Sequence, residues 1–475
     1  MAGVPEGPQA FFRLSPAERS NALCFGLERG ELTGRVDVNF WRLTPLFRHR
    51  FAKPSFPLVE LGKIVELVQY GISSLASSER RGVPMVRMNN LQKDGWDLND
   101  LKYIELPEGE LETYRLKAGD ILFNRTNSKE LVGKCEVFRE PGDWVFASYL
   151  IRMRLTAGVS PQFVSDFLAT SAGRLQIDRF SRQIIGMTNI NAEELRQIVV
   201  PLPHNEQKQQ EFVAAMDIMR TSRNEKLKEA DELLAGLDGF LLSLLALESP
   251  PRDSRKVFAV HRRQVQQEHR LNSDYFHPER ILALRSLDRA AANFNGCRLE
   301  DAVDFIRDQV KTPSANYLSL ANVQSHTGEL VEANEEAAGA CSMFKTGDVL
   351  FARLRPYLNK VYRAEMDGCC SPEFHVLRVR DSHALLPDYL AVVLRGSIIL
   401  AQTKHMMTGN THPRLANDDV VDLVIPVPKP EVQEKIAREV RRRREQARRL
   451  RAQAEAEWLA ARYKFEDELL GSGDP

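Results

Sequence analysis

Polar side chains lie at the ends of two short apolar runs, and directly after them. The two runs have nearly the same sequence. In "KAGDILFNR", which begins at Lys117, and "KTGDVLFAR", which begins at Lys345, six of nine residues agree. The polar residues at and after the ends of these runs are Asn124, Arg125, Thr126 and Asn127 in the first, and Arg353, Arg355, Tyr357, Asn359 and Lys360 in the second. Guanidinium, amide and ammonium groups hydrogen-bond to base edges and phosphates. Each side chain is equally consistent with a solvated or salt-bridged surface group.

A second pair of loops combines glycine with small polar side chains. These loops are "IIGMTNINAEEL" around Gly186 and "MMTGNTHPRLANDDV" around Gly409. Glycine permits close backbone approach, and short polar side chains reach phosphates or bases. The candidates are Thr188, Asn189, Asn410, Thr411, His412 and Arg414. No carboxylate or nucleophile stands at a suggestive spacing from His412, so we interpret it as a hydrogen-bonding or surface histidine.

A third pair of loops is "QYGISSLASSERRGVP" and "IRDQVKTPSANY". Both follow the first helix of a repeated segment that is described below. Their small and basic residues suit phosphate binding, and a solvated loop is an equally good interpretation. The candidates are Gly71, Ser73, Ser74, Arg80, Arg81, Arg307, Lys311 and Thr312.

The catalytic motifs that can be searched for by sequence pattern do not occur in this chain. The chain has no Walker A loop and no HExxH. It also has no Gly-rich cofactor loop and no (Asn/Asp)-Pro-Pro-(Tyr/Phe) loop, the nearest letters being "SPEF" at Ser371. A nuclease carboxylate cluster is too loose a pattern to search for. We expect no catalytic residues and no cofactor.

The six cysteines predict no metal site. They form no CxxC pair and no Cys/His cluster at zinc spacing. The vicinal Cys369 and Cys370 fit a redox pair less well than two buried small hydrophobic residues.

Composition indicates a soluble globular protein of several domains. The chain has 475 residues, of which 43% are hydrophobic and 27% charged, and its formal net charge is +0. This balance excludes attraction of the whole molecule to nucleic acid but permits a local basic face. The first residues lack the apolar core of a signal peptide, and the chain has no uncharged apolar run of about 18 residues. We expect a cytoplasmic protein without membrane contact.

The repeated run belongs to a much longer internal repeat. "RVDVNFW" at Arg35 matches "RLNSDYF" at Arg270, and "LGKIVELV" at Leu61 matches "LEDAVDFI" at Leu299. "MNNLQ" at Met88 matches "LANVQ" at Leu320, and "VVPLPHNEQKQQEF" at Val199 matches "VIPVPKPEVQEKIA" at Val424. The offset stays between about 224 and 238 residues, so the matches are collinear. One unit of roughly 230 residues is used twice.

Each unit begins with mixed elements and ends in a long helix. Short apolar runs such as "VPMVRMNNL", "DILFNR", "SYLIRMRL" and "DVLFARL" predict strands, and "PQFVSDFLATSAGRLQIDRF" and "PDYLAVVLRGSIILAQT" predict helices. The Gly-Asp step of the repeated run predicts a tight turn, followed by a core strand at Ile121, Leu122 and Phe123. The fold class is therefore mixed α/β.

The spacing of the apolar residues changes after each "PLP" or "PVP" segment. A seam with steps of three and four runs through Phe212, Met216, Met219, Arg223, Leu227, Ala230, Leu234, Leu237, Leu241 and Leu244. A second seam runs through Val440, Arg443, Ala447, Leu450, Ala454, Trp458, Ala461 and Phe465. This spacing is typical of a coiled coil. Two such helices would most simply pack on each other; the alternative is that each packs on its own module. The run "REVRRRREQARRLR" at Arg438 fits partner docking or solvation better than DNA contact.

These features together resemble the specificity (S) subunit of type I restriction-modification systems. The resemblance rests on two modules that each contain "GD(I/V)LF.R" and end in "PLP" or "PVP", with a Gln a few residues later, before a long helix, and it covers roughly Arg35 to Leu470. It implies two tandem target recognition domains, separated by an antiparallel coiled coil of two long helices and related by a pseudo-twofold internal repeat. Each domain would read half of a bipartite, asymmetric double-stranded DNA site. About 34 residues at the start have no counterpart in the second copy.

The resemblance also implies partners and boundaries. The partners would be two methyltransferase (M) subunits and the restriction/translocase (R) subunits, and this chain would be a non-catalytic recognition subunit. Alternatives are a DNA-recognition subunit of another phage-defence or DNA-modification assembly, and a coiled-coil scaffold that binds only proteins. The expected segments are an N-terminal extension at 1–56, recognition domains at 57–203 and 297–428, long helices at 204–250 and 429–475, and a connector at 251–296.

Overall fold

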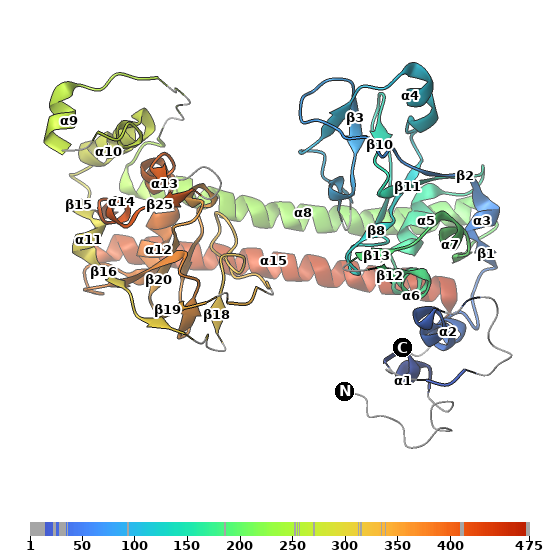
Figure 1. The fold of residues 1–475 in the computed structure, drawn as a ribbon. Coiled ribbons are helices and arrows are strands. Elements are labelled where there is room, and N and C mark those ends of the chain that lie inside the picture. Colours follow the sequence, from blue (N-terminus) through green and yellow to red (C-terminus); the bar gives the residue numbers. More distant parts are fainter. Residues whose placement is uncertain are drawn as a thin grey trace. The chain divides into compact units, whose positions relative to one another are not determined.

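The computed structural model describes residues 15–21, 25–27, 35, 37–92, 95–184, 187–250, 253, 255, 257–268, 271–311, 313, 316–333, 335–337, 339–408 and 413–471. The chain forms two compact units. Unit 1 comprises residues 1–225 and 453–475, and unit 2 comprises residues 226–452. Figure 1 shows the elements of each unit in the colours of the sequence.

A four-stranded antiparallel sheet in the order β2-β11-β7-β9 forms the centre of unit 1. Its strands are β2 (Val65–Tyr70), β11 (Leu150–Leu155), β7 (Ile121–Asn124) and β9 (Cys135–Val137). The smaller sheets pair β1 (Leu58–Glu60) with β14 (Val199–Pro201), β4 (Leu91–Gln92) with β5 (Gly95–Trp96), β10 (Val145–Phe146) with β3 (Val83–Val86) and β6 (Lys102–Ile104), and β12 (Arg182–Ile184) with β13 (Met187–Asn189) and β8 (Thr126–Asn127). The short helices are α1 (Pro16–Asn21), α2 (Val38–Arg50), α3 (Leu61–Ile64), α4 (Glu108–Tyr114), α5 (Pro161–Leu168), α6 (Ser171–Phe180) and α7 (Ala192–Arg196).

Unit 2 repeats this plan around the sheet β16-β23-β20-β21. Its strands are β16 (Val303–Ile306), β23 (Phe374–Val379), β20 (Val349–Ala352) and β21 (Val361–Arg363). The other sheets pair β15 (Asn295–Arg298) with β26 (Val424–Val427), β24 (Met407–Thr408) with β25 (Arg414–Leu415), and β17 (Gln309–Val310) with β19 (Cys341–Phe344), β22 (Gly368–Cys370) and β18 (Tyr317–Leu318). The short helices are α9 (Arg262–Glu268), α10 (Pro278–Arg289), α11 (Leu299–Ala302), α12 (Pro387–Arg395), α13 (Ser397–Thr403) and α14 (Asn417–Val421).

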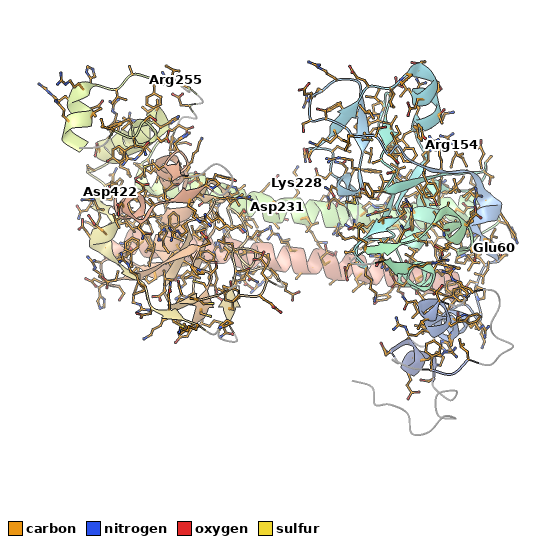
Figure 2. All side chains as sticks on the ribbon, in the orientation of Figure 1. Glu60, Arg154, Lys228, Asp231, Arg255 and Asp422 are labelled. Atoms are coloured by element: carbon orange, nitrogen blue, oxygen red, sulfur yellow. The ribbon has the colours of Figure 1, made fainter. Side chains whose placement is uncertain are left out.

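The repeated "K.GD" phrase forms the same turn in both units, which confirms the predicted tight turn. Gly119 and Gly347 have φ values of +92° and +91°, a conformation that glycine adopts at little cost. The next residue, Asp120 or Asp348, accepts a hydrogen bond from the backbone N–H of Lys117 or Lys345. Each aspartate also pairs with an arginine on the neighbouring strand: Arg154 in unit 1, labelled in Figure 2, and Arg378 in unit 2. The shared phrase therefore builds the scaffold.

A buried glutamine of unit 1 and a buried glutamine of unit 2 occupy equivalent positions. Gln176 on α6 exchanges two hydrogen bonds with the backbone of Val199, and Gln402 on α13 does the same with Val424. Because each side chain satisfies both a donor and an acceptor of a strand, it can be buried without loss of hydrogen bonds. The two units thus share hydrogen bonds as well as strand order.

Each of the two predicted single helices in the modules is divided in two. Thr170 ends the first: its hydroxyl accepts a hydrogen bond from the Gly173 N–H and caps α6. Gly396 divides the second into α12 and α13. The sequence pattern missed both breaks because apolar residues continue at helical spacing across them.

Two long helices follow the modules, as predicted: α8 (Glu206–Leu245) and α15 (Pro430–Leu470). In unit 1 the Phe212 ring lies 5.6 Å from the Phe465 ring, and Arg223 pairs with Glu455 at 2.6 Å. In unit 2 Asp231, labelled in Figure 2, pairs with Arg451 at 2.8 Å, and Leu234 packs with Ala447. Residue numbers rise on α8 as they fall on α15, so the segments within each unit are antiparallel. Within the described ranges, no helix has the length and apolar character needed to cross a membrane.

Candidate nucleic-acid interface

Strand pairing in unit 1 brings together two loops that are about 60 residues apart in the chain. β8 pairs with β13, which places Thr126 opposite Asn189 and Asn127 opposite Thr188. The amide of Asn189 donates to the Thr126 hydroxyl at 3.1 Å. The first and second predicted loops are therefore one surface.

Arg125 lies at the centre of this surface. Its guanidinium stands 4.7 Å from the centroid of the Tyr70 ring and donates to the Ser148 carbonyl at 3.3 Å. Its backbone N–H donates to the carbonyl of Tyr149. The residues Tyr70 and Tyr149 are 38% and 48% exposed, so the cation lies over one partly exposed tyrosine ring and its backbone adjoins a second exposed tyrosine. Exposed aromatic and guanidinium groups side by side are suited to contacts with bases.

Arg353 is the counterpart of Arg125 in unit 2. Its backbone N–H donates to the Glu373 carbonyl at 2.9 Å, and its carbonyl accepts from Leu415 N–H at 2.9 Å. Next to it, the Arg414 guanidinium forms hydrogen bonds with both carboxylate oxygens of Glu373 at 2.6–3.0 Å. Arg307 and Arg355 are exposed and form no ion pair with any described residue. This part of the surface of unit 2 therefore carries positive charge from Arg307 and Arg355, whereas Glu373 neutralises Arg414.

A hollow of about 230 Å³ lies beside Arg353 and is also lined by Arg307, Phe374 and His375. Burial, with a further contribution from the charge of Arg353, lowers the pKa of His375 to about 4. His375 is therefore neutral at physiological pH. The positive charge of the hollow comes from its arginines.

Six predicted candidates have roles inside the fold, and we remove them from the interface. Asn124, Thr126, Thr188 and Asn359 are buried. The Asn359 amide donates to the Arg395 carbonyl at 2.7 Å, and the Lys360 ammonium donates to the Leu320 carbonyl at 2.7 Å. A Cβ on Gly71 would lie 2.3 Å from the Phe146 carbonyl oxygen, so this glycine is required by packing. Polar residues next to strand ends thus serve the scaffold as often as the surface.

Replacing Gly71 with alanine is expected to lower the free energy of unfolding of unit 1 by about 3 kcal/mol, because the added methyl group meets backbone atoms that cannot rotate away. Urea unfolding measures the change. Gly109→Ala on α4 is the matched control: nothing lies within 4 Å of its added methyl group, so stability should be unchanged or slightly higher. Equal stabilities for the two variants would contradict the packing role of Gly71.

Other predicted residues are exposed or lie outside the described residues. Ser73, Ser74, Arg80, Arg81, Lys311 and Tyr357 are exposed, and Arg81 lies 3.4 Å from Glu79. Thr312, Asn410, Thr411 and His412 lie outside the described residues. Sequence reasoning missed Tyr70, Tyr149 and Glu373. The alternation of "VELVQY" could have identified Tyr70 as a strand end, but nothing in the sequence signals that it lies beside Arg125.

One group of residues in unit 2 resembles a metal site in composition. Ligand atoms of His277, Glu279 and His405 lie within 4.8 Å of one another. The two imidazole rings stack, with centroids 3.4 Å apart and planes 15° apart, and the Nε2 of His405 lies 2.6 Å from the Glu279 carboxylate. The ammonium of Lys404 lies 2.7 Å from the Glu279 carboxylate, where a metal ion would bind. The arrangement fits an ion-pair network better than a metal centre.

Part of the chain that includes the first module matches a family model. Residues 57–233 match the family model described as "Type I restriction modification DNA specificity domain". The chain is 26% identical over 194 residues to the EcoKI specificity subunit of Escherichia coli, covering 40% of this chain and 42% of that one. It is 25% identical over 154 residues to a putative specificity subunit, MjaX, of Methanocaldococcus jannaschii, covering 32% and 36%. The match thus spans about two fifths of these relatives' length.

The S subunit of a type I restriction-modification system from M. genitalium aligns with 88% of this chain and 97% of its own chain, at 10% identity and a TM-score of 0.40.

Proposed function

We propose that this chain, whose residues 57–233 carry a type I restriction modification DNA specificity domain, is the specificity subunit of a type I restriction-modification complex. It reads a bipartite, asymmetric site on double-stranded DNA and directs methyltransferase and restriction subunits to it. The chain itself is non-catalytic and cytoplasmic. The partners, two methyltransferase subunits and the restriction subunits, are those implied by the family.

One observation carries the proposal: the same backbone frame surrounds Arg125 and Arg353, but different polar side chains surround them. Arg125 N–H donates to the carbonyl of Tyr149, and Arg353 N–H donates to that of Glu373. Tyrosine and glutamate present different chemistry from one position. A frame used twice with different surfaces suits the reading of two different short DNA sequences.

The finer architecture is part of the proposal. Residues 57–203 and 297–428 are two target recognition domains, and α8 and α15 form an antiparallel coiled coil that spaces them about a pseudo-twofold axis. Support comes from the seam positions, since every seam residue on both helices is buried or half-buried. The spacing between reading surfaces then sets the gap between the two half-sites.

Deleting this gene is expected to abolish one methylated motif that consists of two short specified parts and an unspecified gap. Methylation sequencing of the whole genome, with and without the gene and after its restoration, measures the motif. Recovery of the tagged chain with a methyltransferase and a translocase distinguishes a full restriction system from another modification assembly. An unchanged set of methylated motifs would overturn the proposal, and so would a chain that binds only proteins.

A further inference from the structure

The residues around Arg125 and Arg353 can be matched one by one. Arg154 and Arg378 pair with the aspartates of the repeated turn, so they are equivalent. Leu67 lies opposite Arg154, and Asp304 lies opposite Arg378. Three residues further on, Tyr70 therefore matches Arg307.

Hydrogen bonds give the other matches. Tyr149 and Glu373 are equivalent because their carbonyls accept from the N–H of Arg125 and Arg353. The carbonyls of these two arginines accept from Ile190 and Leu415, so the preceding residues, Asn189 and Arg414, are equivalent. The residues two positions after the arginines, Asn127 and Arg355, complete the set. These matches define four position pairs: Tyr70/Arg307, Tyr149/Glu373, Asn127/Arg355 and Asn189/Arg414.

The two units have the same residue types at two buried strand positions, whereas their residue types at the four surface position pairs differ. Leu122 and Phe123 are buried in unit 1, as are Leu350 and Phe351 in unit 2. All eight residues of the four position pairs are exposed or half-buried, and none of the pairs holds the same residue type twice. Packing therefore accounts for the shared residues and leaves the four position pairs free to differ.

The chemistry of the two sets points to different bases. Unit 1 presents two asparagines. The Asn127 amide accepts from the Ser128 N–H and donates to the Met88 sulfur, and the Asn189 amide donates to the Thr126 hydroxyl, so each amide keeps a donor and an acceptor site. Asparagine is suited to the N6 and N7 atoms of adenine. Unit 2 presents arginines in the corresponding places. Arginine is suited to the O6 and N7 atoms of guanine.

We propose, on the basis of the proposed function, that these four position pairs determine specificity: Asn127 and Asn189 read adenine in one half-site, and Arg355 reads guanine in the other. Arg414 is a positioning residue for this reading, because the Glu373 carboxylate binds the Nε–Nη2 edge of its guanidinium. Tyr70 and Tyr149 give the first surface an apolar rim. Arg307 gives the second surface a cation at the place of Tyr70.

The test is Arg355→Asn, which places the residue of unit 1 in the frame of unit 2. Arg355 is exposed and has a φ of +48°, and asparagine tolerates this conformation better than most residues, so the variant should fold. Methylation sequencing of cells that carry the variant should show one guanine position relaxed or changed to adenine in one half-site, with the other half-site intact. Binding of the purified complex to the original motif should fall roughly 5- to 100-fold. Asn127→Arg is the reciprocal variant and should change only the other half-site.

Arg289→Gln is the matched control, because it removes an exposed cation of unit 2 that lies on α10 and pairs with Glu248. It should leave the motif unchanged. If the assembled complexes of both test variants select the original motif, the inference fails while the proposed function stands. If a variant abolishes methylation in cells, selection from a random DNA library by its purified complex decides between a changed and an unchanged motif. Failure of the proposed function would appear earlier, when gene deletion removes no motif.

Discussion

Replacing Asp120 with alanine is expected to destabilise unit 1 by about 3–5 kcal/mol. The carboxylate is 1% exposed and lies 2.7 Å from Arg154 and 3.8 Å from Arg152, whose side chain is 3% exposed. Without it, Arg152 remains buried and loses its nearby counter-charge, and the Lys117 N–H loses its acceptor in the turn. An unpaired buried charge accounts for most of the cost.

Tryptophan fluorescence during urea unfolding measures this effect selectively. The four tryptophans, Trp41, Trp96, Trp144 and Trp458, all lie in unit 1. Asp348→Ala is the matched control: it removes the same turn carboxylate from unit 2, but its partner Arg378 is 36% exposed and can be hydrated by water. A smaller loss of stability, of about 1–3 kcal/mol, is expected there. Hydrogen exchange at β20 measures this loss. A fluorescence transition unchanged by Asp120→Ala would show that the ion pair does not stabilise the sheet.

Exchanging residues 57–203 for the equivalent module of a relative is expected to replace one half-site completely and leave the other unchanged. The physical reason is that, among the described residues, the hydrogen bonds and the ring contact of Arg125, Asn127 and Asn189 are made with residues of that module. Methylation sequencing of cells that carry the hybrid gene measures both half-sites at once.

The reciprocal exchange of residues 297–428 is the control and should change the opposite half-site. A change in both half-sites from either exchange would contradict independent reading by two modules. A change in the gap length would assign spacing to the modules and not to the long helices.

Prediction from the sequence was most successful where local pattern governs structure. The Gly-Asp turn, the strands at Ile121–Asn124 and Val349–Ala352, and both long helices were all found. Each depends on short-range spacing: a glycine with positive φ, an apolar run, or a seam of three and four. The breaks at Thr170 and Gly396 were missed because the apolar spacing continues across them.

The candidate interface was predicted less completely. Arg125 and Arg353 were identified from the repeat, and both lie at the centre of their surfaces. Asn124 ends β7, and Asn359 and Lys360 follow β20 by several residues. All three were chosen as polar residues at or after the repeated runs, yet their groups donate to backbone carbonyls within the fold. Burial of a polar side chain depends on which loop covers it, and sequence spacing does not report this.

The duplication, the turn chemistry and the paired seams could all be read from the order of amino acids, because they depend on neighbours within a few residues or on similarity between the copies. The grouping of Tyr70, Tyr149 and Asn189 around Arg125 required the folded chain. Hydrogen bonds between strands that are far apart in the sequence create that grouping. The local hydrophobic pattern indicates which face of a strand is buried. It does not indicate which distant strand will pair with it, and this pairing sets the neighbours of each side chain.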